Sequence, residues 1–142
     1  MPKTAYQSRQ KNMYGVKFNE RELLAILNIA NGMAEIDGKT DQIEVDVIYT
    51  QMMRLGIDHE ELLTLTEDAI MSMDPNTAMN IVAGMTSIQK QYVQALLVVI
   101  MASDGEIHER EMIMLRMITM TCGLPPISMT DIRNTLNTFR NS

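Results

Sequence analysis

The sequence predicts an all-α fold, a compact bundle of about seven helices that contains two pseudo-equivalent units, each with an Asp-Gly turn before a helix. The chain has 142 residues, a common size for one domain. Apolar residues make up 46% of it but aromatic residues only 4%, and 15 residues are Met. Strands favour β-branched and aromatic side chains, so this composition favours helices. Helix-start signals and an internal repeat support the same class.

Capping side chains mark the helix starts. Asn19 followed by Glu22 forms a capping box and predicts a helix over residues 20–34. Gly56 and Gly123 are placed to end helices in the left-handed conformation. Residues 92–102 are apolar on nearly every side and should form the central core helix. The remaining helices are expected to begin near residues 42, 59, 75, 87, 108 and 129.

A repeat becomes visible when the sequence is shifted by 67 residues against itself. The shift needs no gap, and it aligns helix-start and helix-stop residues together. A period near half the chain predicts two helical hairpins packed against each other. The aligned pairs are Asp37 with Asp104, Gly38 with Gly105, Glu44 with Glu111, Met53 with Met120, and Gly56 with Gly123.

The repeated blocks, residues 33–44 and 101–111, resemble the TerB-like tellurite-resistance family. The shared pattern is a small apolar lead, Asp-Gly, a β-branched residue and a Glu seven residues after the Asp. The second block matches best, whereas the first has Thr40 at the β-branched position and Glu35-Ile36 where small residues are usual. The resemblance covers residues 18–142 and implies a seven-helix bundle without catalytic residues. It also implies a link to tellurite and stress resistance, often through complexes near membranes.

Divalent-metal binding by acidic residues is a further implication of the resemblance. Carried over by position, the candidates are Asp37 and Glu44 in the first unit and Asp104 and Glu111 in the second. The pattern also matches the second half of a calcium-binding EF-hand loop, but the first half fails. Its first two ligand positions hold Met33 and Glu35 in one unit and Ile100 and Ala102 in the other. Glu35 and Asp41 add acid to the first unit only. Because oxygen ligands dominate, the ion would be Ca²⁺ or Mg²⁺, and its binding would be weak.

The same acidic residues also suit a purely structural role. A helix N-terminus leaves amide groups unpaired, and Asp or Glu side chains satisfy them, while Asp in a turn can fix its own backbone. This structural role is the interpretation that the sequence favours for both units, and it leaves metal binding as the alternative. No cofactor is expected beyond the Ca²⁺ or Mg²⁺ of the metal-binding interpretation.

Charge narrows the range of partners. Residues 35–74 hold eleven acidic side chains against Lys39 and Arg54. Such a segment repels nucleic acid and attracts divalent cations or a basic protein partner.

Four bases precede the first acid, so residues 1–17 are expected to form a flexible basic tail before a single domain, residues 18–142. The longest apolar run is too short to span a bilayer, and one Cys excludes an internal disulfide, so a cytoplasmic protein is expected.

Catalysis has little support in the sequence. His59 and His108 lie near helix starts among acids, and Cys122 lies at the negative end of a helix, which raises a thiol pKa.

Met114, Met117 and Met120 suit core packing better than soft-metal binding. A groove for a partner helix is a further alternative for a few of the Met residues. We therefore expect a non-enzymatic helical module whose acidic face binds a basic protein partner, a divalent cation, or both. The alternative is a calcium-responsive sensor with degenerate EF-hand-like loops.

Overall fold

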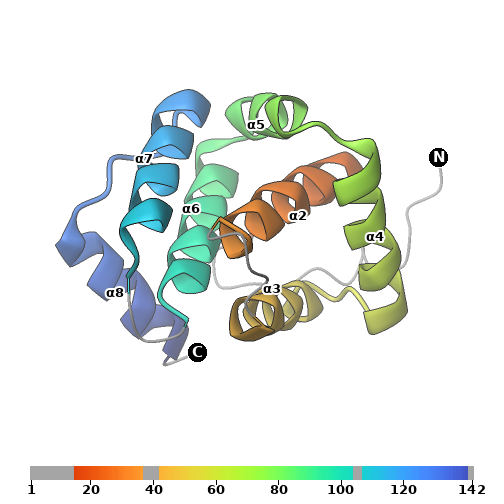
Figure 1. The fold of residues 1–142 in the computed structure, drawn as a ribbon, viewed down its shortest axis with the longest axis horizontal. Helices are drawn as coiled ribbons and strands as arrows, with labels where there is room; N and C mark the ends of the chain where they lie inside the picture. The colour runs from red at the N-terminus through yellow and green to blue at the C-terminus, as the bar shows by residue number, and fades with distance from the viewer. Residues whose placement is uncertain (1–14, 37–41, 104–106, 141–142) are drawn as a thin grey trace.

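The computed structural model describes residues 15–36, 42–103 and 107–140. Within these ranges the chain forms seven α-helices and no strand, which confirms the predicted fold class. Labels follow Figure 1. The helices are α2 (Glu20–Ala34), α3 (Gln42–Arg54), α4 (His59–Ser72), α5 (Pro75–Ala83), α6 (Ser87–Met101), α7 (Glu109–Cys122) and α8 (Met129–Arg140).

Helix starts follow the predicted capping residues because the caps satisfy amide groups that have no partner within the helix. At α2 the Glu22 amide donates to Asn19 Oδ1 at 2.8 Å, and the Asn19 amide donates to Glu22 Oε1 at 2.9 Å. Thr86 and Gln89 form the same reciprocal box at α6. Asp74, the N-cap of α5, is an exception, since its side chain makes no capping hydrogen bond; Pro75 occupies the first helical position.

The repeat is longer than the sequence motif showed. Helices α2 and α6 both have 15 residues, and their first residues, 20 and 87, are 67 positions apart. Helices α3 and α7 begin at residues 42 and 109, the same interval. Gly56 and Gly123 follow them with positive φ angles of 92° and 66°. Each unit is therefore a pair of helices, although the Asp-Gly turns themselves lie outside the described residues.

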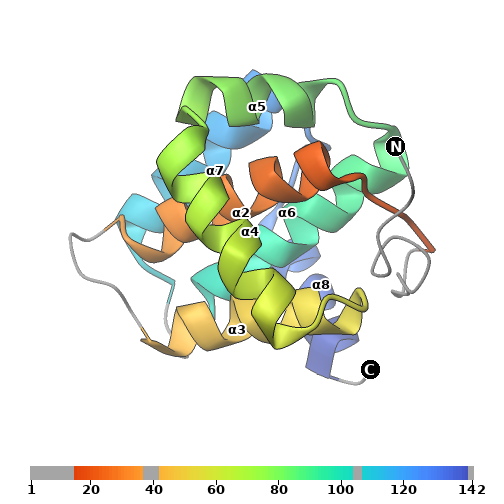
Figure 2. The same cartoon turned by 90° about the vertical axis from the view of Figure 1, so that its right-hand side faces the viewer.

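The core forms around α2 and α6, which contact each other near the centre of the molecule (Figures 1 and 2). Helix α2 also packs against α3, α4 and α5, whereas α6 also packs against α3, α7 and α8. Nine of the fifteen residues of α6 are buried, so the predicted central core helix is confirmed. Val16, within the segment expected to be a tail, is buried in the same core.

The methionines divide between the core and the surface. Met33, Met52 and Met101 are fully buried, as expected of adaptable core residues. On α7 the prediction of a core stripe is wrong for two residues, because Met117 and Met120 are 51% and 84% exposed. The buried side of α7 is carried instead by residues such as Leu115 and Ile118.

Candidate functional site

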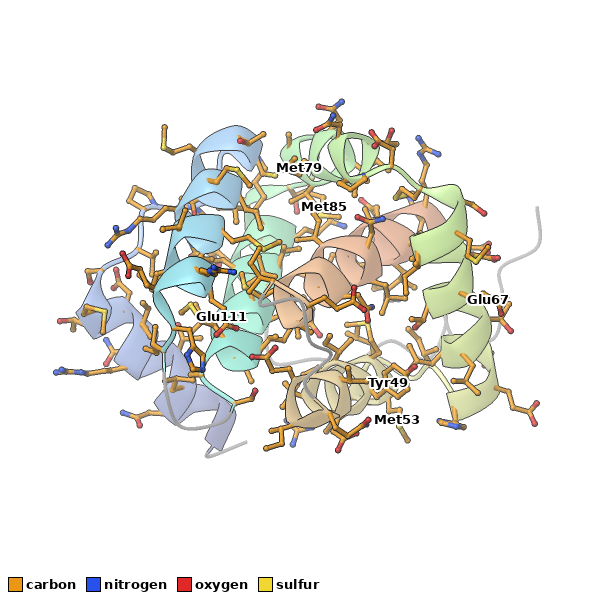
Figure 3. All side chains as sticks on the ribbon, in the orientation of Figure 1. Tyr49, Met53, Glu67, Met79, Met85 and Glu111 are labelled. Atoms are coloured by element: carbon orange, nitrogen blue, oxygen red, sulfur yellow. The ribbon has the colours of Figure 1, made fainter. Side chains whose placement is uncertain are left out.

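Two buried glutamates occupy equivalent places in the repeat. Glu44 is the third residue of α3 and Glu111 the third residue of α7, and they are only 4% and 1% exposed. Figure 3 shows Glu111 on the inner side of α7, toward α6. Taking a carboxylate out of water is costly unless hydrogen bonds, a charge or a metal compensates it. The two units therefore share a buried acidic group, seven residues after the Asp of each Asp-Gly pair in the sequence.

Other acids at helix starts behave differently. Glu22 is also the third residue of its helix, yet it remains partly accessible while it caps Asn19. Asp131 holds the same position in α8 and is exposed; hydrogen bonds from the amide and hydroxyl of Ser128 lower the pKa of its carboxyl group. Capping alone does not require burial, so the environments of Glu44 and Glu111 are set by tertiary packing.

The remaining candidate ligands are only partly placed. Glu35 is the C-cap of α2 and exposed, with its amide donating to carbonyls of the last helical turn. Asp37, Asp41 and Asp104 lie outside the described residues. Within the described ranges no three His, Cys, Asp or Glu side chains gather closely enough to hold a metal ion. The described part of each unit thus contributes one buried carboxylate to any such site.

A groove joins the first unit to the second. It has a volume of about 390 Å³ and is lined by Ile36 at the end of α2 and by four residues of α7, Arg110, Ile113, Met114 and Met117. Ile113 is 56% exposed, so this side of α7 presents apolar surface to solvent. Met114 and Met117 therefore line a groove. That such a groove accepts a partner helix, the alternative that the sequence left open for a few Met residues, stays a prediction.

No described residue forms a recognisable catalytic arrangement. His59 is exposed and its ring meets Tyr49 edge-on at a centroid distance of 6.3 Å. His108 is the N-cap of α7 and makes no capping hydrogen bond through its side chain. Burial raises the pKa of the Cys122 thiol above its ordinary value of 9.0, and the Lys90 ammonium offsets part of this effect. The expected direction is thus found, but its main cause is burial.

The outward face of α4 carries both acid and apolar surface. Glu60, Glu67 and Asp68 are exposed, as are Leu63 and Ile70, whose exposed fractions are 46% and 55%. Figure 3 shows Glu67 projecting away from the bundle. The acidic segment was visible in the sequence, but this face was not predicted as a distinct surface. The sequence did contain a signal for this acidic face, because residues 55–89 contain no Lys or Arg.

No helix in the described part of the chain is both long and apolar enough to cross a membrane. The predicted core helix α6 has 15 residues, fewer than the roughly 20 that a spanning helix needs.

Comparison with known proteins places the chain in a family. No curated protein matches it. Among solved structures it resembles PG1108 from Porphyromonas gingivalis W83, described as a protein of unknown function, at 33% sequence identity and a TM-score of 0.76. That similarity covers 89% of this chain and 99% of the other. The family model for tellurite resistance protein TerB matches residues 21–134, and the chain therefore belongs to the TerB family.

Proposed function

We propose that this protein is a non-catalytic binding module of the TerB type whose acidic face engages a basic protein partner and a divalent cation. The outward face of α4 is the observation that carries the proposal for the partner. Three exposed acids, Glu60, Glu67 and Asp68, lie there beside exposed Leu63 and Ile70. Burial of this apolar surface would stabilise a complex, and the surrounding negative charge favours a positively charged partner.

The spacing along α4 suits a helical partner. Positions 60, 63, 67 and 70 recur every three or four residues and therefore follow one side of the helix. Met71, the next residue, is 77% exposed and extends the apolar surface. A basic amphipathic helix would place its apolar side on Leu63, Ile70 and Met71 and its Lys or Arg residues beside the flanking acids.

Binding of a synthetic helix tests this surface. The probe is a 14-residue Leu-Lys amphipathic peptide, compared with a version in which Glu replaces every Lys. We expect the Lys peptide to bind and the Glu peptide not to bind, and the double change Glu67→Lys with Asp68→Lys to abolish binding. The control is Glu109→Lys, a charge reversal at an exposed acid of α7. Equal losses in the α4 variant and the control would show that only overall charge matters and would refute the assigned face.

The cation part of the proposal is supported by the burial of Glu44 and Glu111 at equivalent positions. Oxygen ligands select Ca²⁺ or Mg²⁺, and only the first unit adds Glu35 and Asp41 to its Asp and Glu. We expect a weak site in that unit, with a Kd of about 0.1 to 1 mM, because water or backbone carbonyls must complete the coordination shell.

Thermal melting with and without several millimolar CaCl₂ or MgCl₂ tests the cation site, since a ligand raises the melting temperature only when it favours the folded state. The shift should disappear in Asp37→Asn with Glu44→Gln and persist in the matched pair Asp104→Asn with Glu111→Gln. An unchanged shift in the first pair would leave these carboxylates as turn and cap residues.

Dye binding separates this module from the calcium-responsive sensor. A sensor opens and exposes new apolar surface on calcium binding, which increases the fluorescence of an apolar-surface dye. We expect no increase. The family name supports a role in tellurite resistance. Growth of a strain lacking the gene, in the presence of tellurite, tests that role.

A further inference from the structure

A second groove lies between α3, the end of α6, and α8. Its volume is about 400 Å³. Val47, Gln51 and Arg54 line it from α3, and their spacing of four and three residues places them on one face of that helix. Val99 of α6 and Leu136 of α8 supply apolar surface to the groove.

Gln51 is the unusual residue in this groove. Its side chain is 8% exposed, yet no described residue forms a hydrogen bond with its carboxamide. Two other buried amides with the same exposure are satisfied: Asn31 donates to the Leu27 carbonyl and Gln94 to the Pro125 carbonyl. The oxygen and nitrogen of the Gln51 side chain still reach solvent through the groove, because neither is among the fully buried side-chain atoms that lack a partner. The carboxamide that lines this groove therefore has both donors and an acceptor to offer to a ligand.

Arg54 supplies a charge next to Gln51. It is exposed and lines the groove. Between Glu22 and Gln89, no other described residue is a Lys or an Arg. No acidic side chain in the described part of the chain forms an ion pair with it. A guanidinium presents a planar fork of N–H groups that matches a carboxylate. Although the protein has a net charge of −6, this arrangement favours an anionic group beside Arg54 in the groove.

Asp46 lines the same groove eight residues before Arg54, about 12 Å away along the helix axis. An extended peptide covers about 3.3 Å per residue, so this interval corresponds to about four residues. The lining residues Asp46 and Arg54 are both exposed, so the groove is open along its edge. An open groove with opposite charges at its ends suits the end of a chain better than a small molecule, which needs to be mostly enclosed.

We propose that this groove binds the carboxyl-terminal segment of a partner polypeptide. Arg54 and Gln51 hold its terminal carboxylate, and Val47, Val99 and Leu136 contact its apolar side chains. Asp46 selects a basic residue three positions before the C-terminus. This site is independent of the proposed cation site and of the α4 face, because it shares no residue with either.

Fluorescence anisotropy with the intact protein tests the proposal. The probe is the fluorescein-labelled peptide Lys-Leu-Val-Leu with a free carboxylate, compared with its C-terminal amide and with Gln-Leu-Val-Leu. We expect the amide to bind at least about tenfold more weakly, which is the loss of one charge-assisted contact. Arg54→Gln should reduce the affinity for the acid to that for the amide. Arg116→Gln, at an exposed arginine of α7, should leave binding unchanged.

Two further variants assign the other contacts. Gln51→Leu should weaken peptide binding without lowering the melting temperature, because the carboxamide makes no hydrogen bond within the described structure. Asp46→Asn should remove the preference for Lys over Gln and leave the preference for acid over amide. These two readouts separate recognition from a structural role.

Several results would overturn the proposal. One is equal binding of the acid and the amide; another is the absence of binding to a folded protein. A third is binding of hexanoate as tightly as the peptide, which would make the groove a small-carboxylate site. Loss of binding in Arg116→Gln as well as in Arg54→Gln would reduce the effect to overall charge. None of these outcomes depends on whether calcium shifts the melting temperature.

Discussion

Replacing Gly123 with valine should destabilise the protein through the backbone. Gly123 ends α7 with φ 66° and ψ 39°, the left-handed conformation, and its amide donates to the Thr119 carbonyl. A residue with a Cβ loses about 1 to 2 kcal/mol in this conformation, and a β-branched residue is among the least suited to it. The site has room, since the nearest atom to a Cβ added at this position would be Lys90 Nζ at 3.4 Å, the end of a flexible side chain.

The expected cost is therefore conformational and amounts to at least about 1 kcal/mol. For a domain of this size, that loss lowers the melting temperature by about 2 to 5 °C. Urea denaturation followed by circular dichroism at 222 nm measures it, with an unchanged m-value showing that the unfolded state is the same.

Gly84 provides the matched control. It ends α5 with φ −87°, an ordinary conformation, and an added Cβ would lie 3.6 Å from the Ile81 carbonyl oxygen, a normal contact. Gly84→Ala should therefore be neutral or stabilising by up to about 1 kcal/mol, because alanine restricts the unfolded chain. If Gly123→Val and Gly84→Ala had the same stability, the left-handed end of α7 would not be the source of the cost.

Three further predictions concern packing and ionisation. Asn28→Leu should cost about 1 to 3 kcal/mol in urea denaturation, because the Asn28 amide donates to the Ala69 and Met73 carbonyls at 2.8 Å each and ties α2 to the end of α4. Met120→Gln should change stability by less than about 0.5 kcal/mol, since Met120 is 84% exposed, whereas a Gln in place of fully buried Met101 should lower the melting temperature clearly. The raised pKa of Cys122 favours the protonated thiol in the folded state. The stability that this contributes is present below the unfolded-state pKa near 9.0 and is lost as pH rises through the folded-state pKa. Cys122→Ala should therefore reduce the loss of folding stability between about pH 8 and 10.

Sequence signals predicted the helices well because those signals are local. The predicted helix over residues 20–34 agrees with α2, Glu20–Ala34, since Asn19 and Glu22 act within one turn of each other. Gly123 ends α7 for the same reason. The 67-residue repeat was also readable, although the motif showed only its second half and the structure extends it to α2 and α6.

The candidate site was predicted less completely. Glu44 and Glu111 were identified from the Asp-Gly pattern, but their burial was not, because Glu22 occupies the same local position and stays accessible. The groove at Gln51 was missed altogether. Its walls come from α3, α6 and α8, which are distant in sequence, and no local pattern marks an amide that packing leaves without a partner among the described residues.

The sequence alone determined where the helices begin, where several of them end, and that two units repeat, since capping, glycine conformation and apolar periodicity act over a few residues. Only the tertiary structure decided which side of each helix meets another. That choice buries Glu44 and Glu111 and leaves Met117 and Met120 of α7 in solvent. The physical reason is that burial depends on the neighbours that the rest of the chain supplies, and these cannot be read from a residue's own turn of helix.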